Sequence, residues 1–263
     1  MADRKTALIT GASFGIGLEL ARIFAREGYN LVLVARTADK LRQLASEVEK
    51  THGTKSLILA ADLTDPGAPA YVVDQTTRAD IQVDVLVNNA GFGQYGFFAE
   101  NDLEECLRQI QLNVATLTHL TRLYLPGMIE RKSGSVLNVA STAAFQPGPL
   151  MAVYFATKAY VLHFSEALAN ELNGTGVTVT CLCPGATATE FHKRANATGM
   201  RFLKFGSMDA RTVAEDGYRA LMAGKPVVIS GFKNWLLAQS VRFSPRSVVT
   251  AIARKTQEQK SAT

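Results

Sequence analysis

A tyrosine and a lysine four positions apart are the residues of this sequence best suited to chemistry. They stand in the run Tyr154-Phe-Ala-Thr-Lys158, and on a helix residues at i and i+4 share one face. A lysine charge beside a phenol favours the phenolate, so the spacing predicts a lowered pKa for Tyr154. Such a pair can exchange a proton near neutral pH, as acid–base chemistry at an alcohol or carbonyl requires. Ser141, upstream in the chain, can hold the same oxygen by a hydrogen bond.

A glycine-rich turn near the start of the chain is suited to binding a phosphate. The run Thr10-Gly-Ala-Ser-Phe-Gly-Ile-Gly17 follows a strand-like segment and opens a helical one. Glycine permits a tight turn and a close approach of backbone to ligand. The helix then presents free N–H groups and its positive dipole end to a pyrophosphate. The pattern predicts a dinucleotide site, and a glycine-rich turn without a ligand is the alternative.

The end of the second expected strand reports on which dinucleotide is bound. NAD sites usually place an acidic side chain there to accept hydrogen bonds from the ribose hydroxyls. Here the strand ends in Ala35 and Arg36, without an acid. The Arg36 guanidinium is suited to a 2′-phosphate, so we predict NADP(H) in preference to NAD(H). A solvated arginine at a strand end is the alternative.

Apolar runs of strand length alternate with longer helical patterns along the chain. We expect strands at 6–10, 31–35, 56–60, 83–88, 134–139, 177–183 and 226–230, and helices at 15–26, 38–50, 102–126 and 153–173. This alternation implies an α/β protein with a parallel sheet, and strands rich in Val, Leu and Ile fit a sheet covered on both faces. We predict one domain over residues 1–231, with a substrate loop at about 186–210 and a basic amphipathic C-terminal extension at 232–263.

Composition excludes several classes of protein. The 263 residues are 47% hydrophobic and 19% charged, as in an ordinary globular domain. Cys106, Cys181 and Cys183 have no metal or redox spacing, so we expect buried thiols and no metal. The net charge of +5 lies in the tail, which gives no argument for nucleic-acid binding. No uninterrupted apolar run reaches roughly 18 residues and no secretory signal opens the chain, so we expect a cytoplasmic protein.

Taken together, these segments resemble the short-chain dehydrogenase/reductase family from Lys5 to about Gly231. The resemblance rests on ordered motifs, namely the glycine-rich turn, Asp62-Leu63, Asn88-Asn-Ala-Gly91, Asn113, Ser141, Tyr154-x-x-x-Lys158, and Pro184-Gly185 with Thr189. It implies a single-domain Rossmann-type doubly wound parallel sheet of about seven strands with helices on both faces. It also implies a homodimer or homotetramer.

The resemblance implies roles for individual residues. Its catalytic group consists of Asn113, Ser141, Tyr154 and Lys158. Its cofactor-binding residues, to which we add Arg36, are Gly11, Ser13, Phe14, Gly15, Ile16, Gly17, Asp62, Leu63, Asn89, Ala90, Gly91, Tyr154, Lys158, Pro184, Gly185, Thr187 and Thr189. Phe14 stands where members that use NADP often carry a basic residue, so Arg36 must supply most of the discrimination. By themselves, Asp62 could equally cap a loop, Asn113 could kink a helix, and the threonines could form plain turns.

The function expected is hydride transfer between a nicotinamide and the carbonyl or secondary alcohol of a small hydrophobic substrate. Tyr154 would be the general acid and base, and Ser141 would stabilise charge on the reacting oxygen. Lys158 would hold the nicotinamide ribose, and Asn113 would hold a water that relays protons to Lys158. A non-catalytic NADP-binding regulatory protein and a membrane-associated interaction protein are the alternatives.

Two apolar segments are expected at the substrate. The loop at 186–210 contains Phe191, His192, Met200, Phe202, Leu203, Phe205 and Met208, and the fourth expected strand is followed by Gly93, Tyr95, Phe97 and Phe98. These residues would line a pocket for a hydrophobic ketone, aldehyde or alcohol. Packing of the loop onto the rest of the domain is the alternative.

The tail carries the charge of the chain and an amphipathic pattern. Lys233, Arg242, Arg246, Arg254, Lys255 and Lys260 stand against Glu258 alone, and Val248, Val249, Ile252 and Ala253 share one helical face. This helix could lie on an anionic membrane surface, cover the substrate pocket or pack against a second subunit. We expect residues 256–263 to be disordered.

Overall fold

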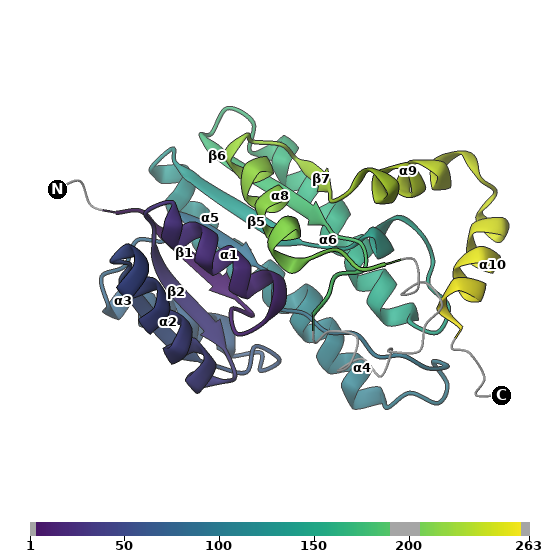
Figure 1. Ribbon diagram of the computed structural model, residues 1–263, viewed down its shortest axis with the longest axis horizontal. Helices are drawn as coiled ribbons and strands as arrows, with labels where there is room; N and C mark the ends of the chain where they lie inside the picture. Colours follow the sequence, from purple (N-terminus) through teal and green to yellow (C-terminus); the bar gives the residue numbers. More distant parts are fainter. Residues whose placement is uncertain (1–3, 190–205, 259–263) are drawn as a thin grey trace.

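Seven parallel strands form one sheet in this computed structural model, which describes residues 4–189 and 206–258 (Figure 1). The spatial order is β3-β2-β1-β4-β5-β6-β7. The strands are β1 (Thr6–Thr10), β2 (Asn30–Ala35), β3 (Ser56–Ala60), β4 (Val85–Asn88), β5 (Gly134–Val139), β6 (Val177–Cys183) and β7 (Val227–Ile229). The predicted α/β doubly wound fold is therefore confirmed, with strand bounds within two residues of those expected.

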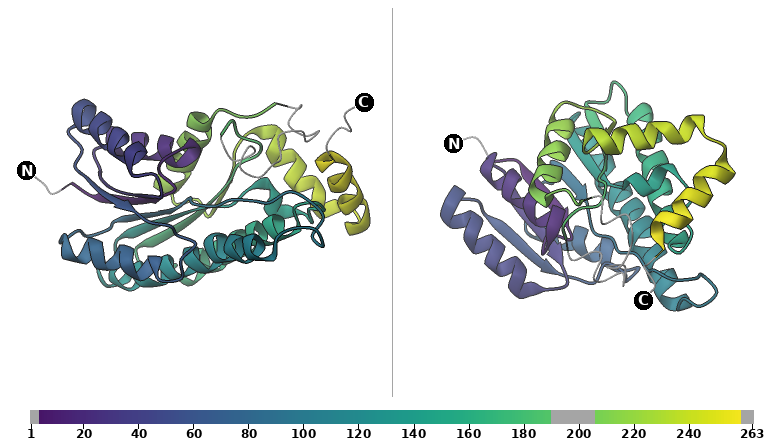
Figure 2. Two further views of the ribbon diagram at one scale, coloured as in Figure 1. Left: turned by 90° about the horizontal axis from the view of Figure 1, so that it is seen from below. Right: turned by 45° about the vertical axis from the view of Figure 1, so that its right-hand side comes forward.

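Helices cover both faces of the sheet (Figure 2). One face carries α1 (Gly15–Arg26), α2 (Ala38–His52) and α8 (Ala210–Met222), and the other carries α3 (Ala68–Arg78), α5 (Leu117–Glu130) and α6 (Ala152–Glu171). Alternate residues of each strand pack against the two helical layers, because successive side chains on a strand point to opposite faces of the sheet. In β1, Ile9 packs with the first layer and Leu8 with the second, and both are fully buried.

The strand order creates the place where a ligand can bind. The chain winds outward from β1 to β2 and β3, then returns to β4 on the other side of β1. The connections leaving β1 and β4 therefore diverge, which opens a crevice beyond the carboxyl ends of these strands. The glycine-rich turn follows β1, and Asn89 follows β4.

The expected helix at 102–126 differs most from the prediction. It divides into α4 (Leu103–Ile110), a π-helical segment η1 (Gln111–Thr116) and α5, which continues past Pro126 to Glu130. Asp102 caps α4 by accepting a hydrogen bond from the Glu105 amide at 3.0 Å. The π-helical segment contains Asn113, and such segments occur frequently at functional sites.

The C-terminal extension forms helices beyond the carboxyl ends of the strands (Figures 1 and 2). These are α9 (Phe232–Ser240), a short 3-10 segment η4 (Val241–Phe243) and α10 (Arg246–Gln257). The expected disorder is wrong for Thr256 and Gln257, which close α10, whereas residues 259–263 lie outside the described part. Within the described ranges, no helix is long and apolar enough to cross a membrane, and no cluster of three His, Cys, Asp or Glu suits a metal.

Truncation of a buried side chain at the centre of the sheet should lower the free energy of unfolding. Leu86 in β4 is fully buried, so Leu86→Ala should lower the free energy of unfolding by about 2–5 kcal/mol. Leu103→Ala is the control, because Leu103 is 63% exposed and its truncation should change stability by less than about 0.5 kcal/mol. Urea unfolding measures both, and equal losses would contradict this account of the core.

Candidate active site

One cavity of about 1690 Å³ lies at the carboxyl ends of the strands and gathers most of the predicted site. Its wall includes Gly11, Ser13, Phe14, Gly15, Ile16, Arg36, Asp62, Leu63, Asn89, Ala90, Gly91, Ser141, Tyr154, Lys158, Pro184, Gly185, Thr187 and Thr189. Two predicted residues, Gly17 and Asn113, do not line the cavity but support its wall from behind. Residues far apart in the sequence therefore share one site.

The turn after β1 is held by residues at the end of β4. Asn89 Nδ2 donates to the carbonyl oxygens of Thr10 at 2.8 Å and Gly11 at 3.3 Å. The Thr10 hydroxyl in return accepts hydrogen bonds from the Asn89 and Ala90 amides, at 2.9 and 3.0 Å. The Asn89 side chain is thus a structural clamp on the glycine-rich turn.

Two glycines make this clamp possible. Gly11 has φ +67°, a left-handed conformation that glycine adopts without strain. A Cβ on Gly17 would lie 2.4 Å from both Asn89 Nδ2 and the Gly11 carbonyl oxygen. The third glycine of the motif therefore lets α1 pack against the clamp, while its backbone stays outside the cavity wall.

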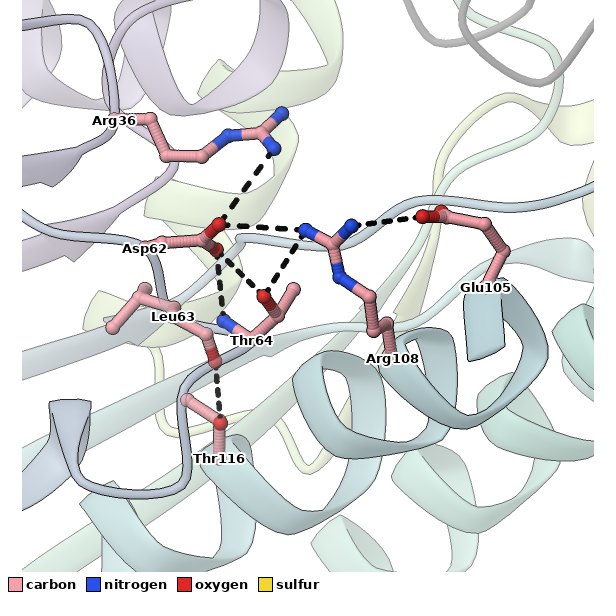
Figure 3. A network of polar contacts seen from close by, with 7 residues as sticks. All are labelled: Arg36, Asp62, Leu63, Thr64, Glu105, Arg108 and Thr116. Atoms are coloured by element: carbon pink, nitrogen blue, oxygen red, sulfur yellow. Dashed lines mark hydrogen bonds and ion pairs between the residues drawn. The ribbon is translucent and has the colours of Figure 1, made fainter. Parts of the chain in front are cut away.

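At the opposite end of the nucleotide region, Asp62 lies between two arginines (Figure 3). Its Oδ2 is 4.0 Å from Arg36 Nη1 and 3.4 Å from Arg108 Nη2, and its Oδ1 accepts hydrogen bonds from the Thr64 amide and hydroxyl. Partial burial raises the pKa of Asp62, but the bonds from Thr64 and the two positive charges outweigh it, so the pKa lies below its ordinary value. Arg108 also pairs with Glu105 at 2.8 Å.

Arg108 is a site residue that the sequence did not identify. It lies on α4 and lines the cavity, as does Glu105. An arginine on an amphipathic helix gives no signal in a single sequence that it will meet a carboxylate from the loop after β3. Arg36 is 60% exposed, so its guanidinium is accessible to a ligand.

Ser141 and Tyr154 are hydrogen-bonded to each other, and both line the cavity. Ser141 begins a 3-10 segment, η2 (Thr142–Phe145), and its Oγ accepts a hydrogen bond from the Ala143 amide at 3.1 Å. Burial raises the pKa of Tyr154 to about 12, although the bond to Ser141 lowers it in part. The predicted lowering of this pKa is therefore wrong for the protein alone, and Tyr154 is a neutral phenol at pH 7.

Lys158 lies one helical turn beyond Tyr154, as predicted, but its ammonium group does not point at the hydroxyl. Its Nζ donates to the Val139 carbonyl at 2.7 Å and lies 5.8 Å from the centroid of the Tyr154 ring. The side chain is only 5% exposed, and burial lowers its pKa to about 8. Desolvation of both groups thus outweighs their effect on each other.

Asn113 holds the wall behind Gly91. Its Nδ2 donates to the Phe92 carbonyl at 2.9 Å and to Thr157 Oγ1 at 3.1 Å, while its Oδ1 accepts from the Phe92 amide. A Cβ on Gly91 would lie 3.0 Å from Asn113 Oδ1 and 3.5 Å from Lys158 Nζ. The amide oxygen and the ammonium group therefore approach the same point from two elements.

The turn after β6 is packed against the C-terminal extension. Pro184, Gly185, Thr187 and Thr189 line the cavity, and a Cβ on Gly185 would lie 2.4 Å from Asn234 Nδ2 of α9. Thr187 pairs with Met208 in a short parallel bridge. Further wall residues come from the extension, namely Leu237, Ala238, Val241, Val249, Ile252, Ala253, Thr256 and Gln257. The alternative in which the tail covers the pocket is thus supported.

The apolar residues of the described cavity wall include one that was expected and several that were not. Phe191, His192, Met200, Phe202, Leu203 and Phe205 lie outside the described residues, so their role stays a prediction. Met208 lines the cavity, whereas Gly93, Tyr95, Phe97 and Phe98 do not, and the last two are 51% and 63% exposed. Phe92, Phe145, Met151, Phe155 and Phe232 also line it.

Fold and site together define a nucleotide-binding α/β protein with a serine, a tyrosine and a lysine gathered at the carboxyl ends of its strands, and the comparisons with known proteins agree with this class. Residues 5–199 match the short chain dehydrogenase family. The very-long-chain 3-oxoacyl-CoA reductase of Bos taurus is 35% identical over 192 residues, which are 71% of this chain and 61% of that protein. The chain spans 60 to 63% of the length of that reductase and three similar curated relatives.

Two solved structures are similar over nearly the whole chain. A short-chain dehydrogenase from Sphingobium yanoikuyae in complex with NADPH is 34% identical, with a TM-score of 0.79 and coverage of 91% of this chain and 94% of that one. The bulky-bulky ketone specific alcohol dehydrogenase from Comamonas testosteroni is 31% identical, with a TM-score of 0.77 and coverage of 91% and 92%. The chain belongs to the short-chain dehydrogenase family, which binds nicotinamide cofactors.

The burial of Lys158 should make its contribution to the free energy of unfolding increase with pH. Its pKa falls from 10.5 to about 8 in the fold, so between these values the unfolded chain binds more protons than the folded one. The contribution of Lys158 to the stability of the wild type should therefore rise with pH across this window. Relative to Lys158→Met, the wild type should gain on the order of 2 kcal/mol between pH 7 and pH 10. Urea unfolding of both proteins measures this, and a difference independent of pH would contradict it.

Proposed function

We propose that this chain is an NADP(H)-dependent oxidoreductase that interconverts a carbonyl and a secondary alcohol in a small hydrophobic substrate. One observation carries the proposal: the glycine-rich turn, Arg36 and the hydrogen-bonded Ser141–Tyr154 pair with Lys158 line a single cavity. A nucleotide cradle alone would serve a regulatory protein equally well. The acid–base pair in the same wall favours an enzyme.

The residues present fit a nicotinamide dinucleotide. The glycine-rich turn offers backbone without side-chain bulk, and the start of α1 offers free N–H groups for the pyrophosphate. Asp62 and Leu63 would hold the adenine, Asn89, Ala90 and Gly91 would support the ribose, and Pro184, Gly185, Thr187 and Thr189 would hold the nicotinamide. When bound, the nicotinamide supplies or accepts the hydride.

The protein groups supply the proton. Because its pKa lies near 12, Tyr154 is protonated at neutral pH and can donate to an oxygen on which negative charge develops. Ser141, bonded to Tyr154, can donate to the same oxygen and stabilise that charge. Lys158 would hold the nicotinamide ribose, and its ammonium charge would favour the tyrosinate after the transfer. Asn113 would hold a water through which Lys158 is reprotonated.

The exclusion of bulk water favours this chemistry. Lys158 and Asn113 are 5% and 2% exposed, so charge that develops near them is poorly screened. The proximity of Asn113 Oδ1 and Lys158 Nζ to Gly91 supports their joint role in a proton relay. Cytoplasmic location, a homo-oligomer and membrane contact through the tail stay predictions.

The substrate class rests on the wall of the cavity and on relatives. Phe145, Met151 and Phe155 make the wall apolar near Tyr154, and the C-terminal extension adds Leu237 and Val249. An enzyme specific for bulky-bulky ketones is among the similar structures. The test is NADPH and NADH consumption with a panel of hydrophobic ketones and aldehydes. Tight NADPH binding without turnover of any of them would favour the regulatory alternative.

Loss of the tyrosine hydroxyl should abolish turnover but spare the cofactor. Tyr154→Phe should lower kcat by about 10²-fold or more, because the proton donor is lost. The dissociation constant for NADPH, measured by fluorescence titration, should change little. Tyr160→Phe is the matched control, because Tyr160 lies on the same helix and its hydroxyl bonds only Thr118 among the contacts described. Retained activity in Tyr154→Phe would exclude Tyr154 as the acid.

Loss of the Arg36 charge should change cofactor preference. Arg36→Ala should raise KM for NADPH by roughly 10- to 100-fold, the effect of one charged hydrogen bond, with little change for NADH. Arg42→Ala removes an exposed arginine from α2, outside the cavity, and should change neither value. Steady-state kinetics with both cofactors decide the matter. Equal losses for NADPH and NADH would mean that Arg36 does not contact the 2′-phosphate.

A further inference from the structure

The last residue of α10 is a buried amide without a partner. Gln257 is 3% exposed, and within residues 4–189 and 206–258 neither its Oε1 nor its Nε2 has a hydrogen-bond partner. An amide buried in this way destabilises the fold, because it has lost its hydrogen bonds to water without replacing them. Buried polar groups in native structures are nearly always satisfied, so an exception needs an explanation.

The cavity supplies that explanation. In the described part of the chain, side chains with buried unpaired polar atoms also occur at Ser56, Asn88, Gln109 and Ser230. Gln257 alone among these residues lines the cavity that contains Ser141, Tyr154 and Lys158. The unpaired amide of Gln257 is therefore part of the cavity wall, whereas the unpaired amide of Gln109 on α4 lies outside it.

The helix that carries Gln257 is fixed against the rest of the protein. Val249 and Ala253, two turns and one turn before Gln257, are 7% and 2% exposed and line the same cavity. Behind them, the Arg254 guanidinium lies 4.9 Å from the centroid of the Phe97 ring. A substrate that reaches this wall meets the Gln257 amide beside the apolar Val249 and Ala253, while the Thr256 hydroxyl is already bonded to the Ala253 carbonyl.

The charges of the cavity restrict what the amide can recognise. The charged residues that line it within the described ranges are Arg36, Asp62, Glu105, Arg108, Lys158 and Lys233. The first four gather at the nucleotide end, Lys158 lies beneath Tyr154, and Lys233 is an exposed residue of α9. The described residues of α10 that line the wall carry no charge, so a charged group placed against them would be desolvated without a counter-charge from this helix.

We infer that Gln257 determines substrate specificity by hydrogen-bonding a neutral oxygen, a hydroxyl or carbonyl, at the end of the substrate remote from the reacting carbon. The amide can donate through Nε2 and accept through Oε1, so it serves either group. The favoured substrate is then an apolar carbonyl compound with a second, uncharged oxygen. This inference rests on the proposed function for the identity of the reacting group.

The experiment compares methyl ketones of increasing chain length that end in a methyl group, a hydroxyl or a carboxylate. At the best length, the wild type should show kcat/KM roughly tenfold higher for the hydroxyl than for the methyl end, the value of one neutral hydrogen bond. Gln257→Met keeps the length of the side chain without its polar atoms. It should abolish this preference, because kcat/KM for the hydroxyl-ended ketones falls to the value for the methyl-ended ones.

Gln109→Met is the matched control. Gln109 is fully buried and unpaired like Gln257 but does not line the cavity, so this variant should keep the preference for the hydroxyl. Both variants remove an unpaired buried amide and should raise Tm. A merely structural Gln257 would therefore affect Tm alone and leave substrate preference unchanged.

The outcomes separate this inference from the proposed function. A preference that persists in Gln257→Met, no preference in the wild type at any length, or a preference for the carboxylate would overturn the role of Gln257. If no ketone turns over, ligand binding is measured instead. In the presence of NADPH, the increase in Tm caused by an alkanediol is compared with the increase caused by an alkanol of equal length. A preference for the diol that is lost in Gln257→Met would support the inference although the proposed reaction had failed. If the wild type shows no preference for the diol, both the inference and the proposed function are overturned.

Discussion

The contact between the ends of β1 and β4 is the constraint on which the site depends. Asn89 and Thr10 exchange hydrogen bonds across the two strands, which fixes the glycine-rich turn against the sheet. The contact leaves no room for a Cβ at Gly17. The sheet reverses its winding between β1 and β4, and the crevice opens beyond the carboxyl ends of these two strands. A side chain at position 17 would therefore disturb the crevice as well as the turn.

Burial controls the ionisation of the reacting groups. It raises the pKa of Tyr154 to about 12 and lowers that of Lys158 to about 8, so both neutral forms are favoured. The i, i+4 spacing brought the two residues together as predicted, but spacing alone says nothing of desolvation. The lysine is directed by the Val139 carbonyl, a backbone group that no side-chain motif reveals. The phenol therefore remains a proton donor, which suits the reduction of a carbonyl.

Much of the fold could be predicted because its signals are local. Runs of Val, Leu and Ile marked the strands, and glycines marked the first turn. The rest depends on tertiary contacts. The π-helical segment around Asn113 interrupts a continuous helical pattern, and α3 and α8 were not predicted. Arg108 meets Asp62 only because the fold brings α4 to the loop that follows β3.

In the C-terminal extension, the sequence pattern predicts a helix but not which of its faces is buried. Val248 and Ile252 share a predicted face with Val249 and Ala253, yet the first pair is 47% and 59% exposed and the second is buried. The buried row continues to Gln257, beyond the point where order was expected to end. Amphipathic spacing identified the helix, but the direction of its inner face depends on what α10 packs against.

The packing of Asn234 into the space beside Gly185 has a consequence for how such proteins vary. The missing Cβ of Gly185 leaves room for an amide from α9, so the turn after β6 and the extension are shaped to each other. A larger residue at 185 would require a smaller one at 234, and the two positions are expected to change together among related chains. We therefore expect the extension to be exchangeable between relatives only together with the turn after β6.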